Sequence, residues 1–321
     1  SCNSENGPDC LQNAGDLVRT EISLPGFDKI TVFEKVALVL KQGSEQKVEI
    51  ETGEFLLEEV SAIVEGDRLV LRNENGCNLF RDYGVTTVYV TSPNIMEIRS
   101  STGLLISSDG VLNYPNLNLL SESFNNPESE TTDGSFDLSL NATNIRVVVN
   151  GIAYFKLSGT VENLNLNIAA GDSRIEAENL IAQNVNLNHR GTNDMLVNPQ
   201  LTIRGVIRGT GDVVSFNRPE TIEVEEIFTD FKNELGRIHN LRDMPNKLGR
   251  VSKLDSTQIF LMLMIFLRHY TTFELLSLMF SLDTSNVKRW IDSSFQVLGE
   301  VLVKKKLCPL NVSGSKEDFR E

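Results

Sequence analysis

Alternation of apolar and polar residues with a period of two dominates residues 17–229. Segments such as Lys29-Ile30-Thr31-Val32 and Arg68-Leu69-Val70-Leu71 place their apolar side chains on one side, which is typical of half-buried β-strands. From about Ile227 the apolar residues recur with the period of a helix. The pattern therefore predicts a large β domain followed by a small helical domain.

A short unit recurs within the β part: an asparagine, then an apolar residue, any residue, and a second apolar residue. It begins at Asn116, Asn144, Asn163 and Asn184, with a looser copy at Asn94, so that consecutive asparagines are 22, 28, 19 and 21 residues apart. The long step contains the polar residues 125–130, which predict a loop that leaves the repeat. Glycines follow four copies, at Gly103, Gly151, Gly171 and Gly191, and we expect corners with positive φ there.

A repeat of about 20 residues that combines short strands with Gly and Asn corners is typical of a β-solenoid. In that fold each coil stacks on the previous one and buries its Leu, Ile and Val residues. We expect Asn116, Asn144, Asn163 and Asn184 to stack as a side-chain ladder at one corner. A β-sandwich is the competing interpretation, although a sandwich has no reason to keep Asn and Gly in phase.

Residues 17–229 also resemble a known protein family. The residues that carry the resemblance are Phe27-Asp28-Lys29-Ile30, Gly66 to Leu71, Val88-Tyr89-Val90-Thr91-Ser92-Pro93 and Arg208-Gly209-Thr210-Gly211-Asp212-Val213. They are similar to the auto-transporter adhesin head domains of exported proteins and lipoproteins in Bacteroidetes-type bacteria. The resemblance implies a right-handed parallel β-helix and a role in adhesion at the cell surface.

The C-terminal part reads as three short helices, which is the architecture of a helix-turn-helix domain. The first covers residues 255–269. A second begins at a capping box of Thr271 and Glu274 and extends to about Phe280, and a third, capped by Asp283 or Thr284, covers residues 285–298. The outward positions near the start of the third helix suit contacts with DNA: Ser285, Asn286, Lys288 and Arg289.

Residues 231–302 resemble the N-terminal helix-turn-helix of transposases. The carrying residues are Leu254-Asp255, Phe260 to Leu275 with its Leu267-Arg268-His269-Tyr270 segment, Phe280, and Thr284 to Arg289. A transposase of that kind continues into an RNase H-like domain with three metal-binding carboxylates, for which no room is left before Glu321. We therefore expect no transposition activity. Our hypothesis is a truncated tail derived from a mobile element; the alternative is a fusion that binds DNA in the cytoplasm.

Charge divides the chain at the same place. Residues 1–229 hold 16 Lys and Arg against 33 Asp and Glu, whereas residues 230–321 hold 14 against 11. The acidic part would repel phosphates. DNA binding is therefore expected only through residues 255–306, which end in the basic run Lys304-Lys305-Lys306. The expected organisation is a leader (1–16), a β-solenoid (17–229), a helical domain (230–302) and a basic, polar tail (303–321).

The cysteines bear on location. Cys2 opens a polar leader, as in a mature bacterial lipoprotein whose lipid is carried by that residue; the alternative is an arbitrary start of the chain. In an exported protein Cys10 and Cys77 can form a disulfide, leaving Cys308 unpaired. With no CxxC pair and three histidines, no metal and no cofactor are expected. The apolar run from Ile259 to Leu267 is too short to span a bilayer, so membrane attachment would be through the lipid.

The functional expectation is a non-enzymatic surface protein that binds a glycan or a protein. Some β-helices cleave acidic polysaccharides, and the corresponding candidates here are Asp172 with Arg174, and His189-Arg190 with Asp194. Such a site requires these groups to converge with shifted pKa values, whereas Asp and Arg at corners are usually solvated. Catalysis is the less favoured alternative, as is DNA binding by the helical domain.

Overall fold

A computed structural model describes residues 14–76, 84–124, 129, 131–226, 231, 233–235, 254–269 and 271–304. The chain divides into two compact units, Ser1–Val224 and Glu225–Glu321. The first unit is built of strands and the second of helices.

Within the described residues, sixteen strands form one sheet. They are β1 (Leu17–Ile22), β2 (Lys29–Phe33), β3 (Ala37–Gln42), β4 (Lys47–Gly53), β5 (Val60–Glu65), β6 (Arg68–Asn73), β7 (Thr87–Ser92), β8 (Glu97–Ser101), β9 (Leu105–Leu112), β10 (Asn116–Ser121), β11 (Ser135–Val149), β12 (Tyr154–Ile168), β13 (Arg174–His189), β14 (Met195–Ile207), β15 (Val213–Ser215) and β16 (Thr221–Glu226). A single 3₁₀ turn, Leu57–Glu59, precedes β5.

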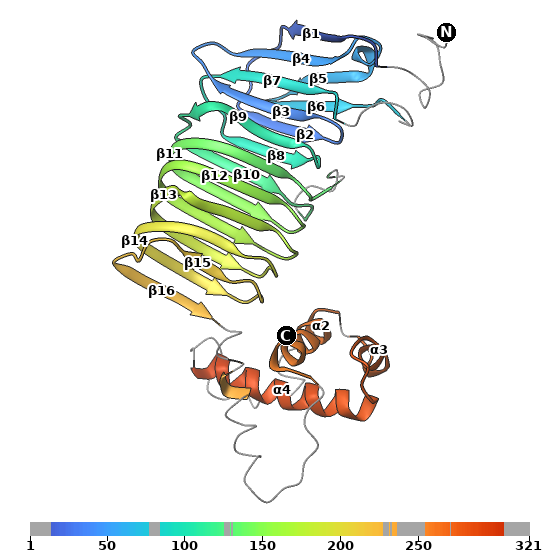
Figure 1. The fold of residues 1–321 in the computed structure, drawn as a ribbon, viewed down its shortest axis with the longest axis vertical. Coiled ribbons are helices and arrows are strands. Elements are labelled where there is room, and N and C mark those ends of the chain that lie inside the picture. The colour runs from blue at the N-terminus through green and yellow to red at the C-terminus, as the bar shows by residue number, and fades with distance from the viewer. Residues whose placement is uncertain are drawn as a thin grey trace, which may run out of the picture. The chain divides into compact units, whose positions relative to one another are not determined.

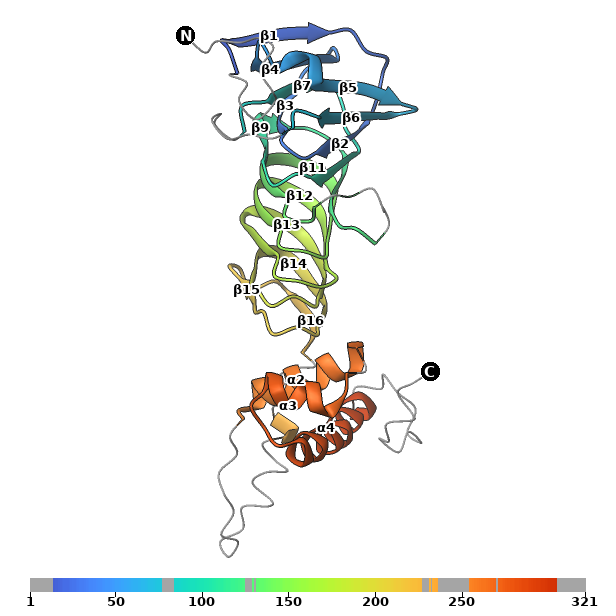
Figure 2. The same cartoon turned by 90° about the vertical axis from the view of Figure 1, so that its right-hand side faces the viewer.

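The sheet curls back on itself around one apolar core (Figures 1 and 2). One run of neighbouring strands is β1-β4-β7-β3-β9, and the other is β5-β6-β2-β8-β10. The two runs meet in β11, whose leading part pairs with β9 and whose trailing part pairs with β10. We call the side formed by the first run and the leading parts of β11–β14 the first face, and the side formed by the second run and their trailing parts the second face.

The long strands β11 to β14 stack in parallel, one above the next (Figure 1). Asn144 of β11 is paired with Asn163, which is paired with Asn184 and then with Thr202. Each coil therefore repeats the previous one after 19, 21 and 18 residues. Parallel pairing of this kind differs from the antiparallel layers of a β-sandwich, so the asparagine-marked segments are vertically aligned.

The core consists of columns of apolar side chains that point inward from successive coils. One column is Ile145, Leu164, Val185 and Ile203, and the next is Val147, Leu166 and Leu187; all are at most 5% exposed. On the first face the rings of Phe136 and Phe155 stack with centroids 4.4 Å apart. Because the strands are paired in register, an apolar residue on one strand lies beside an apolar residue on the next. The buried apolar area therefore grows with each strand that is added to the stack.

The corner of the stack is at residues 141–144, where the alternation of buried and exposed residues in β11 breaks, and Asn144 is the last residue of this corner. The corner glycines differ from expectation. Of the expected corner glycines, Gly171 has a positive φ (88°), but Gly103, Gly151 and Gly191 do not. Close approach explains two of these three, because a Cβ would lie 2.2 Å from the Thr132 carbonyl oxygen at Gly151 and 2.8 Å from the Ile168 side chain at Gly191.

The second unit contains helices α2 (Ser256–His269), α3 (Phe273–Met279) and α4 (Thr284–Lys304). Helix α2 begins with a capping box that the sequence analysis missed, in which Asp255 and Gln258 each accept from the other's backbone N–H. The expected cap of α3 was wrong by one residue: the Thr272 hydroxyl, not that of Thr271, accepts from the N–H of Leu275. Phe266 packs against Phe273 and Phe295, which joins all three helices.

Leu166→Asp should prevent folding of the first unit, because it places an unpaired carboxylate between Val147 and Leu187 in the core. We expect a loss above about 4 kcal/mol in the free energy of unfolding. The neighbouring Asn165→Asp is the matched control, since residue 165 points outward. Thermal denaturation followed by circular dichroism measures both variants, and a Leu166→Asp protein that melts like the parent would contradict the inward assignment.

Candidate functional site

The outward positions of the trailing parts of β10–β14 form a surface rich in amides, which we call the asparagine face. Twelve positions define it, and they carry nine asparagines, two arginines and one threonine: Asn116, Asn118, Asn144, Arg146, Asn163, Asn165, Asn167, Asn184, Asn186, Asn188, Thr202 and Arg204. Neighbouring strands lie about 4.8 Å apart, and successive outward residues along one strand about 7 Å apart. The face is therefore a regular grid of polar groups.

Its first column is a continuous chain of side-chain hydrogen bonds. Nδ2 of Asn144 donates to Oδ1 of Asn116 (2.7 Å), and the same bond recurs from Asn163 to Asn144 (3.1 Å) and from Asn184 to Asn163 (3.2 Å). The hydroxyl of Thr202 ends the chain by donating to Asn184 (2.9 Å). Each amide can make up to four hydrogen bonds, so the ladder leaves donors and acceptors for a ligand.

Two further columns are built in the same way. Asn186 donates to Asn165 (3.3 Å), and Asn188 donates to Asn167 (2.7 Å) while accepting from Arg208 (2.7 Å). These outward positions alternate with the buried residues of the same strands, so the core fixes their register. The result is a surface that is ordered before any ligand arrives, and ordering it costs a ligand little conformational entropy.

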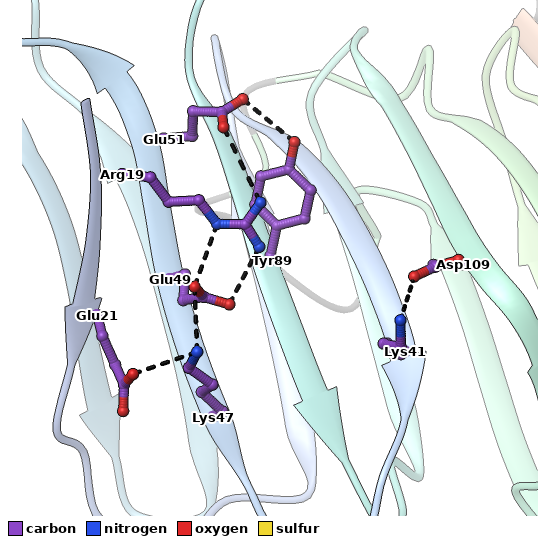
Figure 3. Close-up of polar contacts among 8 residues, drawn as sticks. All are labelled: Arg19, Glu21, Lys41, Lys47, Glu49, Glu51, Tyr89 and Asp109. Atoms are coloured by element: carbon purple, nitrogen blue, oxygen red, sulfur yellow. Dashed lines mark hydrogen bonds and ion pairs between the residues drawn. The ribbon is translucent and has the colours of Figure 1, made fainter. Parts of the chain in front are cut away.

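The first face is charged. At its N-terminal end Arg19 lies over the Tyr89 ring, 3.7 Å from the centroid, and donates two hydrogen bonds to Glu49 (3.0 and 3.2 Å) (Figure 3). Lys47 bridges Glu49 (3.1 Å) and Glu21 (3.2 Å), which face each other across β1 and β4. These charges therefore bind one another, and they fasten the edge strand β1 to the sheet.

The pKa values in this cluster shift in the directions that pairing requires. The hydrogen bond from Arg19 is the main reason why the pKa of Glu49 is lowered, and bonds to Glu49 and Glu21 raise the pKa of Lys47. Burial, together with the hydrogen bond to Glu51, raises the pKa of Tyr89. All of these groups keep their ordinary charge states at neutral pH, so the cluster shows no group adapted for proton transfer.

The structure brings two of the catalytic candidates together: Arg174 binds Asp194 (3.2 Å), and it also binds Glu176 (2.8 Å). Asp172 instead accepts from the Thr192 hydroxyl (2.5 Å). Hydrogen bonds from Tyr154 and Arg174 lower the pKa of Glu176, and the bond to Glu176 raises the pKa of Tyr154 to about 12. A general acid requires a carboxyl pKa that is raised. Arg190 is exposed directly after the end of β13.

His189 was expected beside Asp194 on the surface, but its ring is fully buried in the core. It occupies the inward position between Ile168 and Ile207. Its Nδ1 accepts from the N–H of Gly191 (3.2 Å), which places the proton on Nε2, and Nε2 has no partner with good hydrogen-bond geometry among the described residues. Burial lowers the pKa of His189, against smaller opposite effects of the Asn193 carbonyl and of Asp194 and Asp212.

The remaining sequence candidates have different outcomes. Ser285, Lys288 and Arg289 are exposed near the start of α4, and Asn286 is half-buried. Cys2, Cys10 and Cys77, like Cys308 and most of the insertion at residues 125–130, lie outside the described residues. None of the helices in the described part of the chain is both long and apolar enough to cross a membrane. Nowhere in the same ranges do His, Cys, Asp or Glu side chains gather in threes to hold a metal ion.

The family of the chain follows from its first unit. A model of the family described as "Putative auto-transporter adhesin, head GIN domain" matches residues 26–219. The chain belongs to this adhesin family. Membership in the adhesin family indicates a bacterial protein that is exported or displayed at the cell surface and binds a surface ligand. The match ends before the second unit, so the resemblance of residues 231–302 to transposases stays a prediction.

One solved structure supports the fold. The chain is similar to a putative adhesin from Bacteroides fragilis, with 20% identity and a TM-score of 0.57 over 66% of this chain and 93% of that one. It also matches a "putative lipid binding protein" from Parabacteroides distasonis (16%, 0.47; 66% and 94% covered) and a putative adhesin from Parabacteroides merdae (15%, 0.45; 66% and 96% covered). No curated protein matches the chain.

Acid should destabilise the adhesin unit through His189. Its folded pKa lies below the unfolded value of about 6.5, so the stability it contributes is present above that pH and is lost as the pH falls towards the folded pKa. Between pH 7 and 5.5 we expect a decrease of at most about 1.4 kcal/mol per pH unit. His189→Asn keeps an acceptor for Gly191 but cannot titrate, so urea denaturation should show a flatter pH profile; an unchanged slope would assign the effect elsewhere.

Proposed function

We propose that the protein is a non-enzymatic, exported surface adhesin that binds a glycan or a protein along the asparagine face. The first unit would be a β-solenoid of right-handed coils that acts as the rigid support for this face. The observation that carries the proposal is the grid of in-register amides across the four parallel strands β10–β13.

Amides suit a ligand rich in hydroxyl groups. A side-chain amide offers both donors and an acceptor, so it can bind a hydroxyl in either of that group's roles. Because the grid repeats about every 4.8 Å along the stack, an extended polymer lying on it would meet the same groups at each coil. This favours a glycan over a globular protein, whose interface usually has an apolar centre with aromatic residues.

The contacts on the first face support the proposal that the protein is not an enzyme. On this face Arg174 holds the candidate Asp194 and also Glu176, and His189 is buried in the core. Hydrolysis of a glycan needs one carboxylic acid with a raised pKa beside a second carboxylate. The lowered pKa of Glu176 is the opposite of that requirement.

Asn165→Ala combined with Asn186→Ala should weaken glycan binding about thirtyfold, because it removes two adjacent amides whose net hydrogen bonds contribute about 1 kcal/mol each. The full chain is first screened on a glycan array, and affinity for the best ligand is then measured by calorimetry. Asn141→Ala is the control, because Asn141 forms a separate ladder with Asn113 and Thr160 at the corner. Equal effects of both variants, or none, would remove the asparagine face as the binding surface.

The proposed location depends on a lipid at Cys2. We expect the chain produced in a bacterium with its export signal to be labelled by a radioactive fatty acid and to fractionate with the envelope, and Cys2→Ala to lose the label. A soluble cytoplasmic chain that retards duplex DNA, with a steep salt dependence and a loss of affinity in Lys288→Ala/Arg289→Ala, would instead support DNA binding. The exposure of Lys288 and Arg289 at the start of α4 is the observation that keeps this second function in view.

A further inference from the structure

Arg146 lies in the middle of the asparagine face. It is exposed on β11, and its neighbours in the same column are Asn118 on β10 and Asn165 on β12. Asn144, two residues earlier on the same strand, belongs to the hydrogen-bonded ladder. Three asparagines are therefore the neighbours of Arg146, for whose guanidinium the described residues provide no hydrogen-bond or ion-pair partner.

The other cations on the described strands are all engaged. They are Arg19 with Glu49, Lys29 with Asp67, Lys41 with Asp109, Lys47 with Glu21, Arg68 with Glu97, Arg72 over the Phe33 ring, Arg99 with Glu122, Lys156 with Asp137, Arg174 with Asp194 and Arg204 with Glu223. A chain with an excess of carboxylates can supply a partner for nearly every strand cation. Among the cations of the described strands, the lack of a partner within the described residues is therefore specific to Arg146.

Carboxylates are missing from the asparagine face. None of its twelve positions is Asp or Glu, although residues 1–229 carry 33 of them against 16 Lys and Arg. The acidic groups that border its second column are already bound: Glu97 by Arg68 (2.6 Å) and Glu223 by Arg204 (2.8 Å). Arg146 thus gives the centre of this face a local positive charge within an acidic protein.

We infer that Arg146 binds a carboxylate of the glycan ligand, so that the ligand is a polysaccharide containing uronic acid residues. A guanidinium can bind a carboxylate through two parallel hydrogen bonds. The flanking asparagines offer donors and acceptors for the hydroxyl groups of the same and the adjoining sugars. The inference rests on the proposed function, since it specifies the chemistry of the ligand on the asparagine face.

The acidic surface limits how much charge that glycan carries. The formal net charge of the chain is −14, and repulsion between exposed charges extends about 8 Å at physiological ionic strength. A densely charged polyanion lying along the stack would meet this repulsion along its whole length but only one free cation of the described face. The ligand class is therefore a mostly neutral chain with widely spaced carboxylates.

The test compares two forms of one polymer with the full chain. Polygalacturonate that is partly methyl-esterified keeps some carboxylates, whereas the fully methyl-esterified form has none. The parent protein should bind the partly esterified form about tenfold more tightly, which is the effect of a single charge-assisted interaction. Arg146→Ala should abolish this preference, and Arg146→Lys should keep only part of it because an ammonium cannot form the two parallel bonds.

Lys156→Ala is the matched control, since Lys156 is also an exposed cation of the described strands but lies on the first face, beside Asp137. Equal losses in Arg146→Ala and Lys156→Ala would indicate general charge attraction and overturn the inference. Equal affinity of the parent for both polymer forms, or no binding to either, would also overturn it. The proposed function is judged separately by Asn165→Ala/Asn186→Ala on the array glycan: it fails if that variant binds like the parent or like Asn141→Ala. Unchanged melting of each variant confirms that it is folded.

Discussion

In-register parallel stacking is the constraint on which the structure depends. Each outward residue of a strand lies about 4.8 Å from the corresponding residue of the next strand. A residue type that recurs at the same position must therefore tolerate a copy of itself as its neighbour. A column of equal charges would repel along its whole length. Asparagine satisfies the constraint because each amide can donate to one neighbour and accept from the other, as Asn144, Asn163 and Asn184 do.

The first face meets the same constraint differently. In one of its columns the charges alternate in sign, from Asp137 through Lys156 to Glu176, and Arg174 is paired with Asp194. Exposed ion pairs of this type contribute little individually, but they leave each of these charges with a partner. One sheet therefore presents two chemically different surfaces, of which the amide surface keeps unused hydrogen-bonding capacity while the charged one has largely used it.

The sequence predicted the stacked part of the fold better than the rest. The spacing of the asparagines predicted which segments lie side by side, because a single pattern that is repeated at a nearly constant interval implies one register. It also placed His189 inward, in phase with Val185 and Leu187, although that signal was overlooked in favour of a surface role. The strands before β8 carry no repeat, and their order depends on long-range pairs such as β2 with β8 and β3 with β9, which no local pattern specifies. The sequence predicted that glycine is required at position 151, but the reason is close contact with Thr132 rather than a positive φ.

The constraint also explains why a lone cation is tolerated on the asparagine face. Arg146 and Arg204 share a column, but Asn165 and Asn186 separate them, which places the two guanidinium-bearing strands about 14 Å apart. At that distance their repulsion is largely screened, and Glu223 neutralises Arg204. Amides on both sides of Arg146 cannot neutralise it, yet they do not repel it. Leaving the charge of Arg146 without a partner among the described residues therefore costs the fold little stability. That charge can still interact with a ligand that binds the face.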